Sequence, residues 1–173
     1  LLFAAAELKG DLVAHPDPSR WSLEVIASML PWQPVIDGAV IHGRPVDLIA
    51  AGGAERVDVM VGSNADDWRL FVIANGSPGR VTDETLTGPV ATHGLETALA
   101  YGVSDEAVAA YRAAYPGATP ADLLAAIETD WWCRIPGIRL AEAHLPADAH
   151  LPAEAGTYMY EFAWSAPEVG ACH

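Results

Sequence analysis

The sequence predicts an α/β fold in which two strands of a mostly parallel sheet are separated by a long helical insertion. Runs rich in β-branched and aromatic residues, typical of strands, occur at Arg56–Gly62 and at Thr157–Trp164. Between them, residues 83–144 carry their apolar side chains at helical spacing. Strand, helical excursion and strand in this order indicate the last part of an α/β sheet.

The first third of the chain predicts one helix and then irregular structure. Residues 3–13 read as a helix that ends before Pro16 and Pro18, because proline lacks an N–H donor and biases its predecessor away from the αR region. Residues 21–43 are broken repeatedly by proline and glycine, which favours crossing segments and short strands over one long helix.

The later elements follow from the same signals. The run from Arg56 predicts a strand that ends at Gly62, followed by a turn and a helix near Trp68. Helical spacing continues through three stretches, with interruptions expected at Gly102, Pro116-Gly117 and Pro136-Gly137; the stretches are 96–99, 108–115 and 121–143. Residues 145–155 predict a connecting loop before the second strand.

Composition excludes several classes of protein. The chain has 9 Lys and Arg against 23 Asp and Glu, a formal charge of −14, which repels nucleic acid and anionic membrane surfaces. The acidic excess fits a solvated surface, or a field that favours neutral or cationic substrates. No apolar run approaches the roughly 20 residues that span a bilayer. We therefore expect a soluble protein with no nucleic-acid or membrane partner, and a cytoplasmic location is favoured over secretion.

Chemistry is expected beyond the carboxyl ends of the two strands, where functional groups gather in open parallel sheets. Asp66 and Asp67 follow the first strand, and His173 follows the second. An acid after one strand and a histidine after a later one is the order of the last two members of a Ser-acid-His triad in α/β-hydrolases. The alternative is structural, since an Asp after a strand often caps a helix and a loop histidine is often merely exposed.

Four stretches, in this order, resemble the type-B carboxylesterase family, which includes the cholinesterases. They match a P-x-x-D-G segment, a strand-to-helix turn that bears an acid, the long helix before the last strand, and that strand with its histidine loop. The stretches are 34–38, 61–71, 129–144 and 160–173. The resemblance implies the C-terminal part of an α/β-hydrolase domain.

The resemblance also assigns roles within the triad. Asp67 occupies the position of the catalytic acid and His173 that of the general base. The family usually places Glu at the acid position, so the shorter Asp implies either a closer backbone or a role for Asp66 instead. We prefer Asp67, because Asp66 is better placed to cap the following helix.

A nucleophile motif is missing from the 173 residues. The nearest match to G-x-S-x-G is Gly76-Ser77-Pro78, but Pro78 has no N–H for an oxyanion hole, so Ser77 is interpreted as a turn residue. In the family the nucleophile precedes these stretches, and further chain follows the histidine. We therefore expect 1–173 to be one partial domain that lacks both parts, is inactive alone, and does not fold stably alone.

The remaining reactive residues receive structural interpretations. The five other histidines have no ligand-like spacing, so no metal is expected, and no cofactor is implied. Cys133 and Cys172 are too few for a disulfide scaffold or a metal cage, and free buried thiols are expected. Trp131 and Trp132 either line a substrate gorge or pack in the core. Arg134 and Glu142 are candidates for ion pairs with other elements.

These observations define three functional hypotheses. The first is a serine carboxylesterase that hydrolyses small-molecule carboxylic esters through an acyl-enzyme, completed by the missing N-terminal part of the same enzyme. The second is a non-catalytic, cholinesterase-like binding or adhesion scaffold. The third is an unrelated helical binding domain. Retention of an acid and of His173 favours the esterase.

Overall fold

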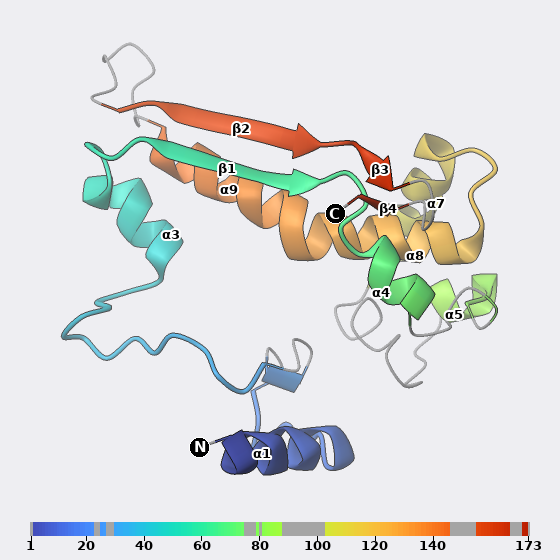
Figure 1. The fold of residues 1–173 in the computed structure, drawn as a ribbon, viewed down its shortest axis with the longest axis horizontal. Coiled ribbons are helices and arrows are strands. Elements are labelled where there is room, and N and C mark those ends of the chain that lie inside the picture. The colour runs from blue at the N-terminus through green and yellow to red at the C-terminus, as the bar shows by residue number, and fades with distance from the viewer. Residues whose placement is uncertain are drawn as a thin grey trace.

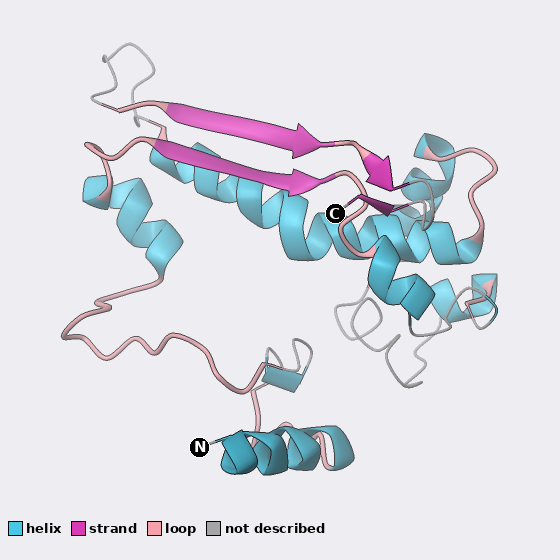
Figure 2. Cartoon of the chain, in the orientation of Figure 1, coloured by secondary structure: helices cyan, strands magenta, loops and turns pink. Residues whose placement is uncertain are grey.

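The computed structural model describes residues 2–22, 25–26, 30–74, 79, 81–87, 103–145, 155–166 and 171–172. The helices are α1 (Leu2–Ala14), α3 (Pro45–Leu48), α4 (Arg69–Ala74), α5 (Asp83–Thr87), α7 (Asp105–Ala114), α8 (Pro120–Thr129) and α9 (Ile135–His144), with π-helical turns η1 (Ile49–Gly53) and η3 (Asp130–Arg134). The strands are β1 (Val59–Asn64), β2 (Thr157–Phe162), β3 (Ser165–Ala166) and β4 (Ala171–Cys172) (Figures 1 and 2).

The sheet confirms the predicted parallel pair. β1 and β2 run side by side in parallel, from Val59 opposite Thr157 to Asn64 opposite Phe162. Both arrows point the same way in Figure 2, so the carboxyl ends of the two strands lie at one edge. This pairing of segments from the two ends of the helical insertion is the α/β arrangement that the sequence predicted.

Gly62 lies inside β1, and the prediction that the strand ends there was wrong. The strand continues to Asn64 because Gly62 meets a neighbouring strand, not a turn. A Cβ atom at Gly62 would lie 2.7 Å from the ring of Tyr160, its partner in the register. Glycine is therefore required by close approach of the Tyr160 side chain and backbone.

Helix α9 covers one face of the sheet (Figure 1). Gly137 faces the strands closely enough that an added Cβ would lie 3.5 Å from Val61 and 3.9 Å from Met159. On the other face, Met60 and Tyr158 expose 73% and 57% of their surface. Within the described residues, α9 thus lies on one side of the sheet, whereas the other side is apolar and exposed.

The helical insertion packs around α8. Thr119 begins this helix with a capping box: its hydroxyl accepts from the Asp122 N–H, and the Asp122 carboxylate accepts from the Thr119 N–H. Pro120 fits the first turn, where no N–H donor is needed. The core that α8 forms with α4, α5 and α7 contains Val72, Val81, Leu86, Val108, Ala121, Leu123, Leu124, Ala125 and Ile127.

The helix is continuous through Pro136-Gly137, where an interruption was expected. Arg134 and Ile135 keep αR backbone angles, so η3 joins α8 to α9 without a break. Pro136 stands in the first turn of α9 after this π-helical turn, a position at which its missing N–H is tolerated. The wider π turn at Asp130–Arg134 was not predicted from the sequence.

The N-terminal region agrees with the sequence in part. α1 matches the predicted helix, and the described residues of the 21–43 segment are mostly irregular. In the P-x-x-D-G segment, the Asp37 carboxylate accepts three backbone N–H groups, from Ala39, Val40 and Ile41, which lowers the pKa of Asp37. α3 and η1 were not predicted. Residues 96–99 and 146–154, expected as helix and loop, lie outside the described residues.

Candidate active site

A single turn carries both candidate acids. β1 ends at Asn64, residues 65–68 turn, and α4 begins at Arg69, whose N–H donates to the carbonyl oxygen of Asp66 over 3.1 Å. The helix starts one residue later than expected. Asp66 and Asp67 are both half-buried in this turn, just beyond the carboxyl end of the strand.

The carboxylate of Asp67 folds back onto the end of β1. One oxygen accepts the backbone N–H of Asn64 at 2.8 Å, and the other accepts the Asn64 side-chain amide at 2.7 Å. Asn64 therefore holds Asp67 through both of its donors, and the rotamer of the acid is determined by the strand that precedes it.

Cys133 lies beside the same carboxylate. Burial, the negative charge of Asp67 and a hydrogen bond to Asp67 together raise the pKa of the Cys133 thiol to about 11. The thiol is therefore neutral at physiological pH. A carboxylate offers about four acceptor sites, so the two donors of Asn64 leave capacity for another, as an orienting acid requires.

The second strand reaches the same edge. The Ala65 N–H donates to the carbonyl oxygen of Phe162 over 2.9 Å, which extends the ladder one step into the acid-bearing turn. After β2, the chain forms a short antiparallel pair in which Ser165 opposes Cys172. This β3–β4 pair was not predicted, and β4 contacts α4.

The structure describes only one member of the predicted acid-histidine pair. His173 lies outside the described residues, as do His93, His150 and the rejected Ser77. β4, which ends one residue before His173, contacts the helix that begins two residues after Asp67 (Figure 1). The pairing of Asp67 with His173 stays a prediction.

The histidines for which interactions are described each contact another protein group at hydrogen-bond distance. The buried His144 contacts the Thr157 hydroxyl through Nδ1 at 2.7 Å and the Ala54 carbonyl through Nε2 at 3.0 Å. His15 pairs with Asp11, and His42 contacts the Gly38 carbonyl. No group of three or more His, Cys, Asp and Glu in the described part of the chain is arranged to hold a metal ion.

The aromatic residues beside the acid pack on one another. Trp68 stacks on Trp132, with ring centroids 5.3 Å apart, and Trp131 meets Trp132 edge-on at 4.8 Å. Phe71 lies 4.8 Å from Trp68. Trp131 and Trp132, expected to line a gorge or to pack in the core, are both half-buried. Through its stack on Trp68, Trp132 connects η3 to the turn that carries Asp67. The ion pair expected of Arg134 is confirmed, with Asp130 and Glu161 as partners.

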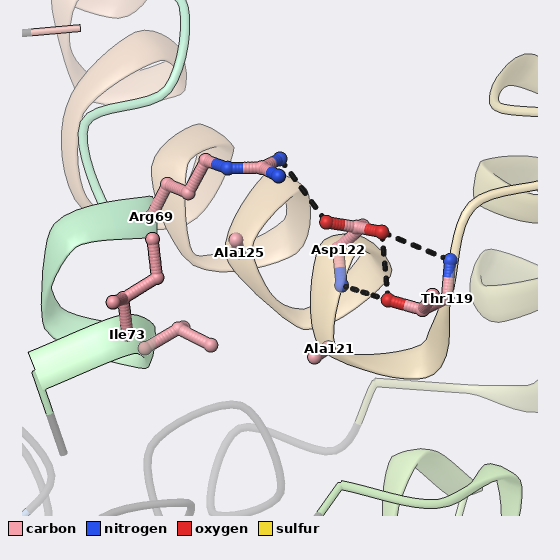
Figure 3. A pocket seen from close by; sticks show the side chains of 7 residues that line it. Arg69, Ile73, Thr119, Ala121, Asp122 and Ala125 are labelled. Atoms are coloured by element: carbon pink, nitrogen blue, oxygen red, sulfur yellow. Dashed lines mark hydrogen bonds and ion pairs between the residues drawn. The ribbon is translucent and has the colours of Figure 1, made fainter. Parts of the chain in front are cut away.

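A small pocket of about 120 Å³ lies between α4 and α8 (Figure 3). Arg69 reaches across it to Asp122 at 3.1 Å. The Thr119 hydroxyl is the main cause that lowers the pKa of Asp122, and Arg69 adds to the effect. Asp67 is not among the lining residues, so this pocket is separate from the candidate acid. Neither Arg69 nor Asp122 was predicted to be a site residue.

Comparison with known families gives the class of this protein. A sequence model of the carboxylesterase family matches residues 19–173. The chain belongs to the carboxylesterase family, as its four family-like stretches predicted. Membership indicates an esterase-type hydrolase that acts on carboxylic esters, and the parallel β1–β2 pair is compatible with part of the α/β fold of such enzymes. Within the described ranges, no helix combines the length and apolar character needed to cross a bilayer.

Proposed function

We propose that the protein is a serine carboxylesterase in which Asp67 is the orienting acid and His173 the general base. The observation that carries this proposal is the Asp67 carboxylate itself. It lies beyond the carboxyl end of a parallel strand, is fixed by Asn64, and keeps capacity for a further hydrogen bond. The family to which the chain belongs supports the ester substrate class.

The proposed reaction proceeds through an acyl-enzyme. The His173 imidazole takes the proton of a serine hydroxyl while the serine oxygen bonds to the ester carbonyl carbon. Collapse of the tetrahedral intermediate breaks the bond to the alcohol, which leaves with that proton. Water then attacks the acyl-enzyme by the same proton route, which releases the acid and the free serine. Asp67 holds the imidazole tautomer and stabilises the imidazolium throughout.

The serine is the part that these 173 residues do not offer in a suitable motif. We place it in additional sequence of the same enzyme, in a G-x-S-x-G after an apolar strand. If that sequence carries a replacement for the serine, the binding-scaffold alternative is favoured instead.

The test is turnover of p-nitrophenyl esters by the full-length enzyme, with and without a serine-directed organophosphate. We expect hydrolysis that the inhibitor abolishes, and turnover that persists in its presence would contradict the serine mechanism. Asp67→Ala should lower kcat by roughly 10²- to 10⁴-fold, whereas Asp66→Ala, the matched control, should leave ester turnover. The reverse result would move the acid to Asp66.

A further inference from the structure

The turn that carries Asp67 is held at both ends by one distant segment, residues 129–134, which runs from the last residue of α8 to the last residue of η3. At the first end, the guanidinium of Arg134 donates from Nη2 to the Ala65 carbonyl over 3.2 Å. At the second end, the N–H of Trp68 donates to the Thr129 hydroxyl over 3.0 Å. Asp66 and Asp67 are the two residues between these contacts.

Arg134 is itself fixed from two sides. Nη2 also donates to Glu161 of β2 at 2.8 Å, and Nη1 bonds Asp130 one turn earlier. Asp130 accepts the Tyr111 hydroxyl of α7 at 2.6 Å. The Arg134 side chain exposes 23% of its surface. Because two carboxylates flank the guanidinium, its charge is largely balanced locally, and its bond to Ala65 acts through geometry.

Thr129 is the more deeply placed of the two residues. Its exposed fraction is 1%, and its hydroxyl accepts an N–H that precedes the first turn of α4. Loss of that hydroxyl leaves a partly buried N–H donor without its partner, which is unfavourable. Between the two contacts, Trp132 stacks on Trp68 and Cys133 lies beside Asp67, so η3 touches the turn along its length.

We propose that Thr129 and Arg134 are positioning residues for the catalytic acid. They bind the two ends of the 65–68 turn to residues 129–134 and thereby set where the Asp67 carboxylate lies. The inference rests on the proposed function, and it adds two residues that touch neither substrate nor the reacting atoms. The π-helical form of η3 places Trp132, Cys133 and Arg134 against this one turn.

The test compares four variants of the full-length enzyme. Thr129→Val keeps the shape of the side chain but loses the hydroxyl, whereas Thr129→Ser keeps a hydroxyl at this position. Arg134→Met removes all guanidinium bonds, and Arg139→Met, at an exposed arginine of α9, is the matched control. The measurements are kcat per titrated active site, KM, the pH profile of kcat/KM, and hydrogen exchange of the amides of residues 64–68.

We expect Thr129→Val and Arg134→Met to lower kcat by roughly 10- to 100-fold, because small misplacements of a catalytic group have effects of that size. KM should change by less than about threefold. The acid limb of kcat/KM should move to lower pH, because an imidazolium without a well-placed carboxylate loses its proton more readily. Exchange should rise at residues 64–68, and both Thr129→Ser and Arg139→Met should resemble the wild type.

The result that overturns the proposal is an unchanged kcat per titrated site, with the same acid limb and unaltered amide exchange. A purely structural role would lower the fraction of active enzyme and leave the pH profile in place. If the wild type hydrolyses no ester at all, the proposed function fails. Amide exchange at residues 64–68 then decides whether Thr129 and Arg134 hold the turn.

Discussion

The indole of Trp132 lies flat on the indole of Trp68, with their planes 6° from parallel. Trp68 immediately follows the candidate acid, whereas Trp132 belongs to the π-helical turn between α8 and α9. This stack is therefore the apolar counterpart of the hydrogen bonds that Thr129 and Arg134 make to the same turn.

The stack predicts an energetic coupling between the two rings. A double-mutant cycle of Trp68→Ala and Trp132→Ala should give a coupling free energy of about 0.5–1.5 kcal/mol, the range of aromatic pairs. Denaturant unfolding of the four proteins measures it. A control cycle between Trp68 and Trp32, in the irregular segment before α3, should give none, and equal values in the two cycles would refute a specific stack.

Two glycines, one inside β1 and one in α9 where it packs on the sheet, predict opposite effects of substitution by alanine. At Gly62 a methyl group would meet the Tyr160 ring at 2.7 Å, so Gly62→Ala should destabilise the protein by roughly 1–3 kcal/mol or more. At Gly137 the nearest atom would be 3.5 Å away, which is ordinary contact. Gly137→Ala should therefore stabilise α9 by about 0.5–1 kcal/mol. Thermal unfolding of both variants checks the signs.

Cys133 predicts a pH-dependent reactivity that reports on Asp67. Only the thiolate is alkylated, and a pKa of about 11 keeps the thiol protonated at pH 7.5. Iodoacetamide should thus modify Cys133 on the order of 100-fold more slowly than a free thiol of pKa about 8.5, and faster as the pH approaches 11. Mass spectrometry of the Cys133 peptide measures the rate.

The same measurement separates the two acids. Asp67→Ala removes a charge and a hydrogen bond that raise the pKa of Cys133, so alkylation should accelerate. Asp66→Ala should leave the rate near its wild-type value. If Asp66→Ala alone accelerated alkylation, Asp66 and not Asp67 would be the acid beside the Cys133 thiol.

The exposed apolar face of the sheet predicts that residues 1–173 do not fold cooperatively as an isolated polypeptide. Met60, Tyr158, Tyr160 and Phe162 expose between 40% and 73% of their surface on one side of β1 and β2. Contiguous apolar surface of this kind marks an interaction site or an aggregation hazard. We expect the polypeptide to bind the dye ANS and to unfold without a sharp transition. Cooperative unfolding with well-dispersed NMR amides would be the contrary result.

The parallel strands could be predicted because their apolar runs are short, bounded and separated by helical spacing. The end of β1 was predicted wrongly at Gly62, because a glycine after an apolar run indicates a turn unless the partner strand is known. The Tyr160 side chain makes glycine necessary at position 62. It stands 98 positions later in the sequence and lies opposite Gly62 in the register of the strands. α3 was missed because it is short and Arg44 provides no side-chain cap, although Pro45 at its start was an available signal.

The acid was found from its place after β1 and from the family resemblance, but its surroundings were not. The bond from Arg134 to Ala65 joins residues 69 positions apart, and that from Trp68 to Thr129 joins residues 61 apart. Neither has a local pattern in the sequence. The π-helical turn could not be predicted either, because its five residues continue the helical spacing of the residues on both sides.

The pairing of β1 with β2 also has a consequence for how the protein is made. The Gly156 N–H donates to the Asp58 carboxylate across 98 positions of sequence, at the start of the paired strands. At a synthesis rate of 5–20 residues per second, β1 waits about 5–20 s for its partner to leave the ribosome. The helices between them form from local contacts and bring the strand ends together, which reduces the entropy of closing the loop. We therefore expect the helical insertion to fold first and the edge that carries Asp67 to assemble last.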